Sequence, residues 1–125
     1  MDTRTRFGLQ LAFAALLGAS PAAAQAPAGV TAAAIAQGDS IFHSKGNCYA
    51  CHGANAQGAV GPNLTDAEWI HSDGSYDAIV KQVTTGVAKE ESKSGIPMPA
   101  KGGSSITDDE VKAVAAYVYS LSHKS

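Results

Sequence analysis

The sequence predicts a small all-α domain of three or four helices joined by long loops. Apolar residues recur at helical spacing in three segments, capping residues precede these segments, and no stretch alternates apolar and polar residues as a strand does. The chain has 125 residues, which is enough for one domain, and contains no internal repeat. Its composition is that of an ordinary folded protein.

Residues 1–24 are expected to be a cleaved secretory signal peptide that does not belong to the domain. Arg4 and Arg6 give a basic start, residues 7–18 are almost entirely apolar, and residues 22–24 are three alanines that suit a cleavage site. An uncleaved membrane anchor is the alternative. The apolar run is shorter than the roughly 20 residues that a bilayer requires, which favours cleavage.

Cleavage would leave a Pro/Gly/Ala-rich lead-in over residues 25–30, expected to be flexible, and a domain over residues 31–125. This mature chain keeps seven lysines, no arginine and ten acidic residues. Such a balance excludes nucleic acid as a partner, because binding it requires clustered cations. We expect a periplasmic protein with no membrane anchor after cleavage, and nothing in the sequence suggests more than a monomer.

The first helix is predicted to begin at Thr31, a possible N-cap, and to end near residues 45–46. Ile35, Gly38 and Phe42 lie along one side of it. A glycine inside a helix costs about 1 kcal/mol relative to alanine. Gly38 therefore indicates a place where another backbone comes close.

The middle of the chain is predicted to hold a loop, a short helical turn and a second helix. Residues 53–62 are rich in Gly, Ala and Asn, and residues 63–70 are expected to form a helical turn that carries Trp69. Ser75 caps the second helix, which ends at Gly86. The apolar face of this helix consists of Ile79, Val80 and Val83.

The last helix has the clearest start signal. Thr107 and Glu110 form a capping box, and two aspartates between them add negative charge to the first turn. The apolar face of this helix consists of Val111, Val114, Val118 and Leu121. The preceding residues 87–105 are polar and interrupted by prolines, which predicts a loop without a buried element.

A chain of this size with so much loop buries too little apolar surface to hold the loops by itself. Small exported domains usually compensate with several disulfides, but this chain has only two cysteines, three positions apart. We therefore expect a bound cofactor to complete the core.

Residues 48–52 read Cys-Tyr-Ala-Cys-His, the pattern for covalent attachment of haem c. Two thiols on one helical turn can add to the two vinyl groups, and the adjacent histidine is then held against the iron. A structural or redox-active disulfide and a zinc site are the alternatives, although zinc requires four ligands. We predict one haem c attached through Cys48 and Cys51, with His52 as an axial ligand.

Met98 is the only methionine of the predicted mature chain and is expected to be the second axial ligand. Prolines on both sides restrict the backbone and could aim the thioether. An isolated methionine is more often a core gap-filler, but the surrounding loop is polar. The competing ligands are His43, His71 and His123, and His71, beside the tryptophan, is the main rival.

These residues together resemble the class I cytochrome c family over essentially the whole predicted mature chain. The resemblance rests on Gly38 and Phe42 ahead of the haem motif, Cys48 to Gly53, Gly61-Pro62-Asn63-Leu64, the Met98 loop and Ala115-Ala116-Tyr117-Val118. Residues 61–70, residues 98–100 and the final helix are especially similar to the cytochrome c subunit of cbb-type terminal oxidases. Those subunits typically carry a membrane helix and two haem motifs, whereas this chain has one motif and no retained anchor, which favours a related soluble carrier.

The resemblance implies a class I cytochrome c fold, in which three to four helices surround one covalently bound haem c and the N- and C-terminal helices cross. Gly38 and Phe42 should then pack against Val114 and Tyr117.

The resemblance also implies partners for the histidine ligand and the haem propionates. The carbonyl of Pro62 should accept a hydrogen bond from the second ring nitrogen of His52, which makes the imidazole more electron-donating. Trp69 or Tyr76 would donate to a haem propionate through its N–H or O–H group. Lys101 or solvent would replace the arginine that such proteins often use there.

We expect the protein to be a soluble electron carrier and not an enzyme, moving single electrons between respiratory or dehydrogenase partners and a terminal acceptor. Its partners would be redox proteins such as a membrane oxidase, a quinol-oxidising complex or a dehydrogenase, meeting it through interfaces below about 1,200 Å². The lysines expected near the haem edge are Lys45, Lys89, Lys93 and Lys101. They could steer such encounters, and a solvated face is the equal alternative.

Two other functions stay open. One is a dedicated haem subunit of a periplasmic dehydrogenase, and the other is a small haem enzyme or gas sensor with a displaceable sixth ligand. The extra polar stretch Lys89 to Gly95 is expected to be a tolerated surface insertion rather than a docking element.

Overall fold

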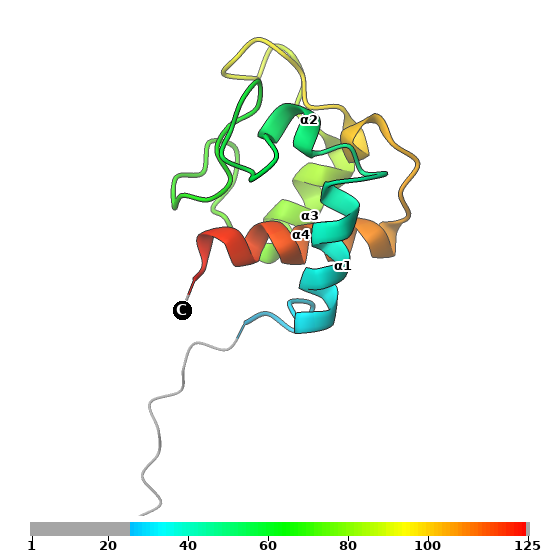
Figure 1. Cartoon of the computed structure of the whole chain (residues 1–125). Helices are drawn as coiled ribbons and strands as arrows, with labels where there is room; N and C mark the ends of the chain where they lie inside the picture. The colour runs from blue at the N-terminus through cyan, green and yellow to red at the C-terminus, as the bar shows by residue number, and fades with distance from the viewer. Residues whose placement is uncertain (1–25, 125) are drawn as a thin grey trace, which may run out of the picture.

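The computed structural model of the chain describes residues 26–124, and the predicted signal peptide lies outside them. The elements in chain order are α1 (Ala32–Phe42), α2 (Tyr49–His52), α3 (Tyr76–Thr85), the 3-10 helix η1 (Ala100–Gly103) and α4 (Asp108–Ser122). Over residues 26–124 the only extended pairing is a single antiparallel bridge between Val87 and Met98. The all-α prediction is confirmed (Figure 1).

The first and last helices cross in close contact, as the resemblance implied. A β-carbon added to Gly38 of α1 would lie 1.9 Å from the carbonyl oxygen of Ala113 in α4. Beside it, the ring of Phe42 meets the ring of Tyr117 edge-on, with centroids 5.3 Å apart. Phe42 and Val114 are almost completely buried. In Figure 1, α1 crosses α4, and α2 lies above this crossing.

The start of α1 is confirmed, but its predicted end is wrong. The Thr31 hydroxyl accepts a hydrogen bond from the Ala34 amide at 3.1 Å. The helix ends at Phe42, because the amides of Ser44 and Gly46 both turn back to the carbonyl of Ile41. This tight turn, rather than further helix, leads the chain to the cysteines.

The caps of α3 and α4 are confirmed. The Ser75 hydroxyl accepts from the Ala78 amide at the start of α3, and Gly86 ends that helix with a φ of 72°. At the start of α4, the hydroxyl of Thr107 accepts from the Glu110 amide at 3.2 Å. The Glu110 carboxylate accepts from the Thr107 amide at 3.1 Å, which completes the capping box.

The helical turn predicted over residues 63–70 is absent from that segment. The carboxamide oxygen of Asn63 accepts the amide of Thr65 at 2.8 Å, and the carboxylate of Asp66 accepts the amide of Glu68 at 3.2 Å. Short polar side chains thus satisfy the amides locally and compete with the helical ladder.

The polar segment 87–105 is more structured than predicted. Val87 is buried, and its amide and carbonyl pair with Met98. The positive φ of Gly86 reverses the chain here, and a β-carbon on Gly86 would lie 2.3 Å from the Met98 carbonyl oxygen. The sequence pattern missed this pairing because a single bridge has no periodicity.

The lead-in makes a defined contact where the structure describes it. The Val30 amide donates to the Pro27 carbonyl at 2.8 Å, and Gly29 lies against the ring of Tyr76. No helix of residues 26–124 is both long enough and apolar enough to cross a membrane.

The tight crossing predicts that Gly38→Ala destabilises the protein by about 2 kcal/mol, because the new methyl meets backbone that cannot move aside. Helix propensity alone predicts the opposite sign, a gain of about 1 kcal/mol. Thermal unfolding of the haem-loaded protein measures the difference, with the exposed neighbour Gln37→Ala as the control. A stabilised Gly38→Ala variant would show that the helices are not in contact there.

Candidate cofactor site

A cavity with mainly apolar walls lies between the helices and the loop that carries Met98. Its lining includes Phe42 of α1, Val83 of α3 and Val114 of α4, which belong to the main core. Cys48, Cys51, His52 and Met98 also line it. The fold therefore brings the four predicted haem-binding residues to one place.

Cys48 and Cys51 lie on a single helical turn at the cavity wall. Cys48 is the N-cap of α2 and Cys51 lies inside this helix. Both are half-buried free thiols. Burial raises the pKa of the Cys48 thiol to about 11. A thiol oxidant or a redox-active disulfide needs a depressed thiol pKa, so this environment does not favour that alternative.

The zinc alternative also lacks support. Residues 26–124 contain no group of three or more His, Cys, Asp or Glu side chains arranged to hold a metal ion. Two thiols and one imidazole at the edge of a large apolar cavity do not make a closed tetrahedral site.

His52 is buried and its ring is held by a backbone carbonyl. Its Nδ1 lies 2.9 Å from the oxygen of Pro62. A carbonyl can only accept, so Nδ1 carries the proton and donates, which leaves the lone pair on Nε2. Burial lowers the pKa of His52, which favours the neutral imidazole. This tautomer is the one that can bind iron.

Gly61 leaves room for this histidine. A β-carbon on Gly61 would lie 2.9 Å from Cε1 of His52, and the Gly61 amide donates to the carbonyl of Cys51 at 2.8 Å. The loop that supplies the Pro62 carbonyl is thereby fastened to the attachment helix.

Met98 reaches the cavity from a different segment of the chain. Its amide donates to the Val87 carbonyl at 3.0 Å, and its carbonyl accepts from the Val87 amide at 2.8 Å. Both backbone groups of Met98 are thus fixed to the segment that follows α3. The side chain is half-buried and also packs against the core, so the loop is less polar in its contacts than its sequence suggested.

The structure separates the competing ligands. His71 is exposed but contributes to the cavity lining, whereas His43 and His123 do not line it. His71 is therefore the rival to Met98, as the sequence indicated.

The two residues predicted to contact a haem propionate lie in different places. Trp69 lines the cavity, with the indole nitrogen edge close to Gly74. Tyr76 does not line it, and its hydroxyl lies 3.5 Å from the carbonyl of Lys112. Tyr76 thus lies away from the cavity, since the first turn of α3 directs it toward Gly29 and α4, and its role at a propionate stays a prediction without support from the cavity lining.

Two of the four candidate lysines are used within the fold. Lys45 pairs with Glu110, and Lys101 pairs with Asp108 at 3.1 Å. The hydrogen bond from Lys45 is the main cause of the lowered pKa of Glu110. Both acids belong to the first turn of α4, so the acidic capping residues also tie down the segments on either side of the cavity. In the sequence these acidic residues indicated only the start of a helix, and their pairing with the two lysines was not predicted.

Haem c fits these residues. Two thiols, a neutral imidazole and a thioether are the donor set for attachment and axial ligation of haem, and the apolar walls suit the macrocycle. Among the described residues, no buried side-chain polar atom lacks a hydrogen-bond partner. The described residues therefore leave no buried polar side chain waiting for a polar occupant, which is consistent with a largely apolar group in this cavity.

The fold is similar to solved structures of cytochromes. Cytochrome cL from the marine methylotrophic bacterium Methylophaga aminisulfidivorans matches with a TM-score of 0.59 and 25% identity, over 75% of this chain and 57% of that one. Cytochrome cL from Hyphomicrobium denitrificans matches in fold, with a TM-score of 0.56 and 19% identity, over 71% of this chain and 48% of that one. The fold and the donor set define a class I c-type cytochrome with one covalently attached haem c.

Residues 33–118 match the family described as cytochrome c oxidase, cbb3-type, subunit III, and the chain belongs to this family. Similar relatives include the cbb3-type oxidase subunit CcoP of Rubrivivax gelatinosus, 41% identical over 90 residues, and that of Azospirillum brasilense, 38% identical over 98 residues. The matches cover 71% and 74% of this chain, but only 26% and 32% of those proteins. The chain thus corresponds to about a quarter to a third of its relatives' length.

The space beside His52 predicts that Gly61→Ala displaces the imidazole, because the new methyl would meet the ring. We expect a changed haem absorption spectrum and a loss of about 1 to 3 kcal/mol of stability. Ala59→Ser, an exposed change two positions away, is the control and should leave both unchanged. A Gly61→Ala protein with the wild-type spectrum and stability would argue against tight packing around His52.

Proposed function

We propose that this protein is a soluble periplasmic one-electron carrier whose haem c is attached at Cys48 and Cys51 and ligated by His52 and Met98. The observation that carries the proposal is the convergence of His52 and Met98 on one apolar cavity. The predicted signal peptide supports a location outside the cytoplasm.

His52 supplies a permanently oriented ligand. The hydrogen bond from Nδ1 to Pro62 fixes the tautomer and the ring plane, and it makes Nε2 a stronger donor. Because burial keeps the ring neutral, no proton has to leave before the ligand can act.

Met98 supplies a neutral, soft ligand on a constrained backbone. Its pairing with Val87 and the prolines on both sides limit the positions that the thioether can reach. A His/Met pair raises the reduction potential relative to other axial sets.

A haem held by these residues would supply the one-electron chemistry of its iron. The chain's own contribution is to hold both ligands and to surround the group with apolar walls that include Phe42, Val83 and Val114. With side chains at both axial positions, no coordination position is left open for a substrate, which suits a carrier better than a haem enzyme.

The proposed partners are larger redox proteins. The oxidase relatives support a membrane oxidase among them, and a quinol-oxidising complex or a dehydrogenase would serve as the electron donor. Lys89 and Lys93 are exposed and could steer a monomeric carrier into transient encounters with its partners. Lys45 and Lys101, by contrast, are paired within the fold.

A second candidate function is a dedicated haem subunit of a larger enzyme. The relatives that carry this domain as part of a much longer oxidase subunit favour it. Purification under native conditions separates the two functions: a stable stoichiometric complex supports the subunit, and a free haem protein supports the carrier.

The proposed ligation predicts the behaviour of Met98→Leu, which keeps the apolar volume but removes the sulfur. We expect the midpoint potential to fall by tenths of a volt, within the about 0.8 V that axial ligation spans, and the methionine-to-iron absorption band to disappear. A redox titration with optical spectra measures both.

The matched variant is His71→Ala, which removes the rival ligand from the same cavity. It should keep the wild-type band and potential. If the band and the potential were unchanged in Met98→Leu but altered in His71→Ala, the ligand would be His71 and not Met98.

A further inference from the structure

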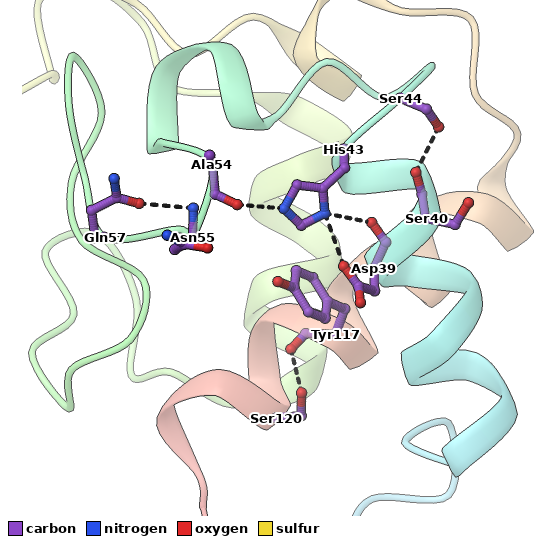
Figure 2. Close-up of polar contacts among 9 residues, drawn as sticks. All are labelled: Asp39, Ser40, His43, Ser44, Ala54, Asn55, Gln57, Tyr117 and Ser120. Atoms are coloured by element: carbon purple, nitrogen blue, oxygen red, sulfur yellow. Dashed lines mark hydrogen bonds and ion pairs between the residues drawn. The ribbon is translucent and has the colours of Figure 1, made fainter.

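His43 is the C-cap of α1, and both nitrogens of its ring contact oxygen atoms (Figure 2). Nδ1 lies 2.8 Å from the carbonyl oxygen of Asp39 and 2.8 Å from Oδ1 of the Asp39 side chain. On the other side of the ring, Nε2 lies 2.6 Å from the carbonyl oxygen of Ala54. The ring therefore links the last turn of α1 to the loop that follows the attachment motif.

Only one protonation state satisfies these contacts. A carbonyl or a carboxylate oxygen can only accept a hydrogen bond, so each ring nitrogen must donate. Neutral histidine has a single N–H and would leave a lone pair facing an oxygen at 2.6 or 2.8 Å. The doubly protonated imidazolium makes both contacts at once.

The surroundings of His43 contain one charged group and two phenols. Asp39 faces it from α1, Tyr49 stacks against it from α2 with ring centroids 6.5 Å apart, and Tyr117 meets it edge-on from α4 at 6.0 Å. The hydrogen bonds to the Asp39 and Ala54 carbonyls raise the pKa of His43, in that order of size. Burial opposes this shift, and the charge and hydrogen bond of the Asp39 carboxylate add to it.

The loop held by His43 is the one that leads out of His52. Ala54 is two residues beyond His52, and the amide of Gly58 returns to the His52 carbonyl at 2.7 Å. Asn55 and Gln57 are joined within this loop by a hydrogen bond of 2.9 Å, also drawn in Figure 2. A tether at Ala54 thus restrains a compact loop whose two ends both adjoin His52.

We propose that the imidazolium of His43 is a positioning residue: it clamps the loop after the attachment motif to α1 and so fixes the backbone that carries His52. Loss of its proton removes one side of the clamp and one positive charge from the residue that holds the loop after His52. This inference rests on the proposed ligation by His52 and assigns a proton-linked control to the same site.

The linkage has a defined sign. Reduction adds negative charge to the site, so the reduced protein holds the His43 proton more tightly and takes up a fraction of a proton from solvent with each electron. The midpoint potential should therefore fall as pH rises through the pKa of His43 and be flat on either side.

The clamp itself is tested without reference to electron transfer. Because folding raises the pKa of His43 above its usual value of about 6.5, its contribution to stability is complete below that value and is lost as pH rises through the folded pKa. Proton NMR titration should place the pKa of His43 above about 6.5 in the wild type and lower it in Asp39→Asn. A value at or below about 6.5 in the wild type would overturn the clamp.

The positioning role is tested by redox titrations between about pH 5 and 9 on the wild type, His43→Gln and the matched control His123→Gln. Like His43, His123 is exposed, lies outside the cavity lining and bonds a backbone carbonyl of its own helix, but it makes no hydrogen bond to the loop after the attachment motif. We expect the fall in potential over the titration of His43 to be lost in His43→Gln and kept in His123→Gln. The same pH profile in His43→Gln as in the wild type would overturn the inference.

The optical spectra keep this outcome separate from the proposed ligation. His43→Gln should retain the axial bands of the wild type, because neither ligand is touched. If the wild type itself lacks the bands of His/Met ligation, the proposed function fails, and this is visible before any His43 variant is made.

Discussion

The close crossing of α1 over α4 at Gly38 is the constraint on which the rest of the structure depends. Only a glycine allows the α1 backbone to approach the Ala113 carbonyl so closely. This approach buries Phe42, the last residue of α1, against Tyr117. The turn that follows then delivers the two cysteines and His52 to the cavity wall, while α4 supplies Val114 behind them. A wider crossing would separate the attachment motif from the apolar wall that faces it.

The first turn of α4 extends this organisation to the second half of the site. Its acidic residues cap the helix and also bind Lys45 and Lys101, which lie on the segments before the cysteines and after Met98. The pairing of Val87 with Met98 closes the remaining side. One helix thus contacts segments more than fifty residues apart in the sequence, which lie before the cysteines and after Met98.

Features that leave a signature within a few residues of the sequence were predictable, even where, as at Gly38, the contact partner is distant. The capping box at Thr107, the cap at Ser75 and the close approach at Gly38 each have a signature within a few residues, and all three are present. The helical turn predicted at residues 63–70 does not form, because the side chains of Asn63 and Asp66 accept hydrogen bonds from backbone amides in this segment.

Contacts across the chain explain the remaining differences. Tyr76 was assigned to the cofactor by resemblance, yet the contacts of α3 with α4 and of Gly29 with its ring set its direction. The clamp at His43 is of the same kind, since neither Asp39 nor Ala54 marks it in the sequence. The family assignment, by contrast, agrees with the resemblance seen in the sequence. That resemblance rests on the order and spacing of several motifs along the chain, and this spacing reflects distant contacts that no single motif reveals.

X-ray absorption at the iron edge of the purified, oxidised protein at neutral pH tests directly whether Met98 is an axial ligand. Ligation by Met98 requires a sulfur atom in the first coordination shell of the iron in the wild type and its loss in Met98→Leu. A first shell of nitrogen atoms alone in the wild type, or a sulfur atom that survives in Met98→Leu, would contradict ligation by Met98.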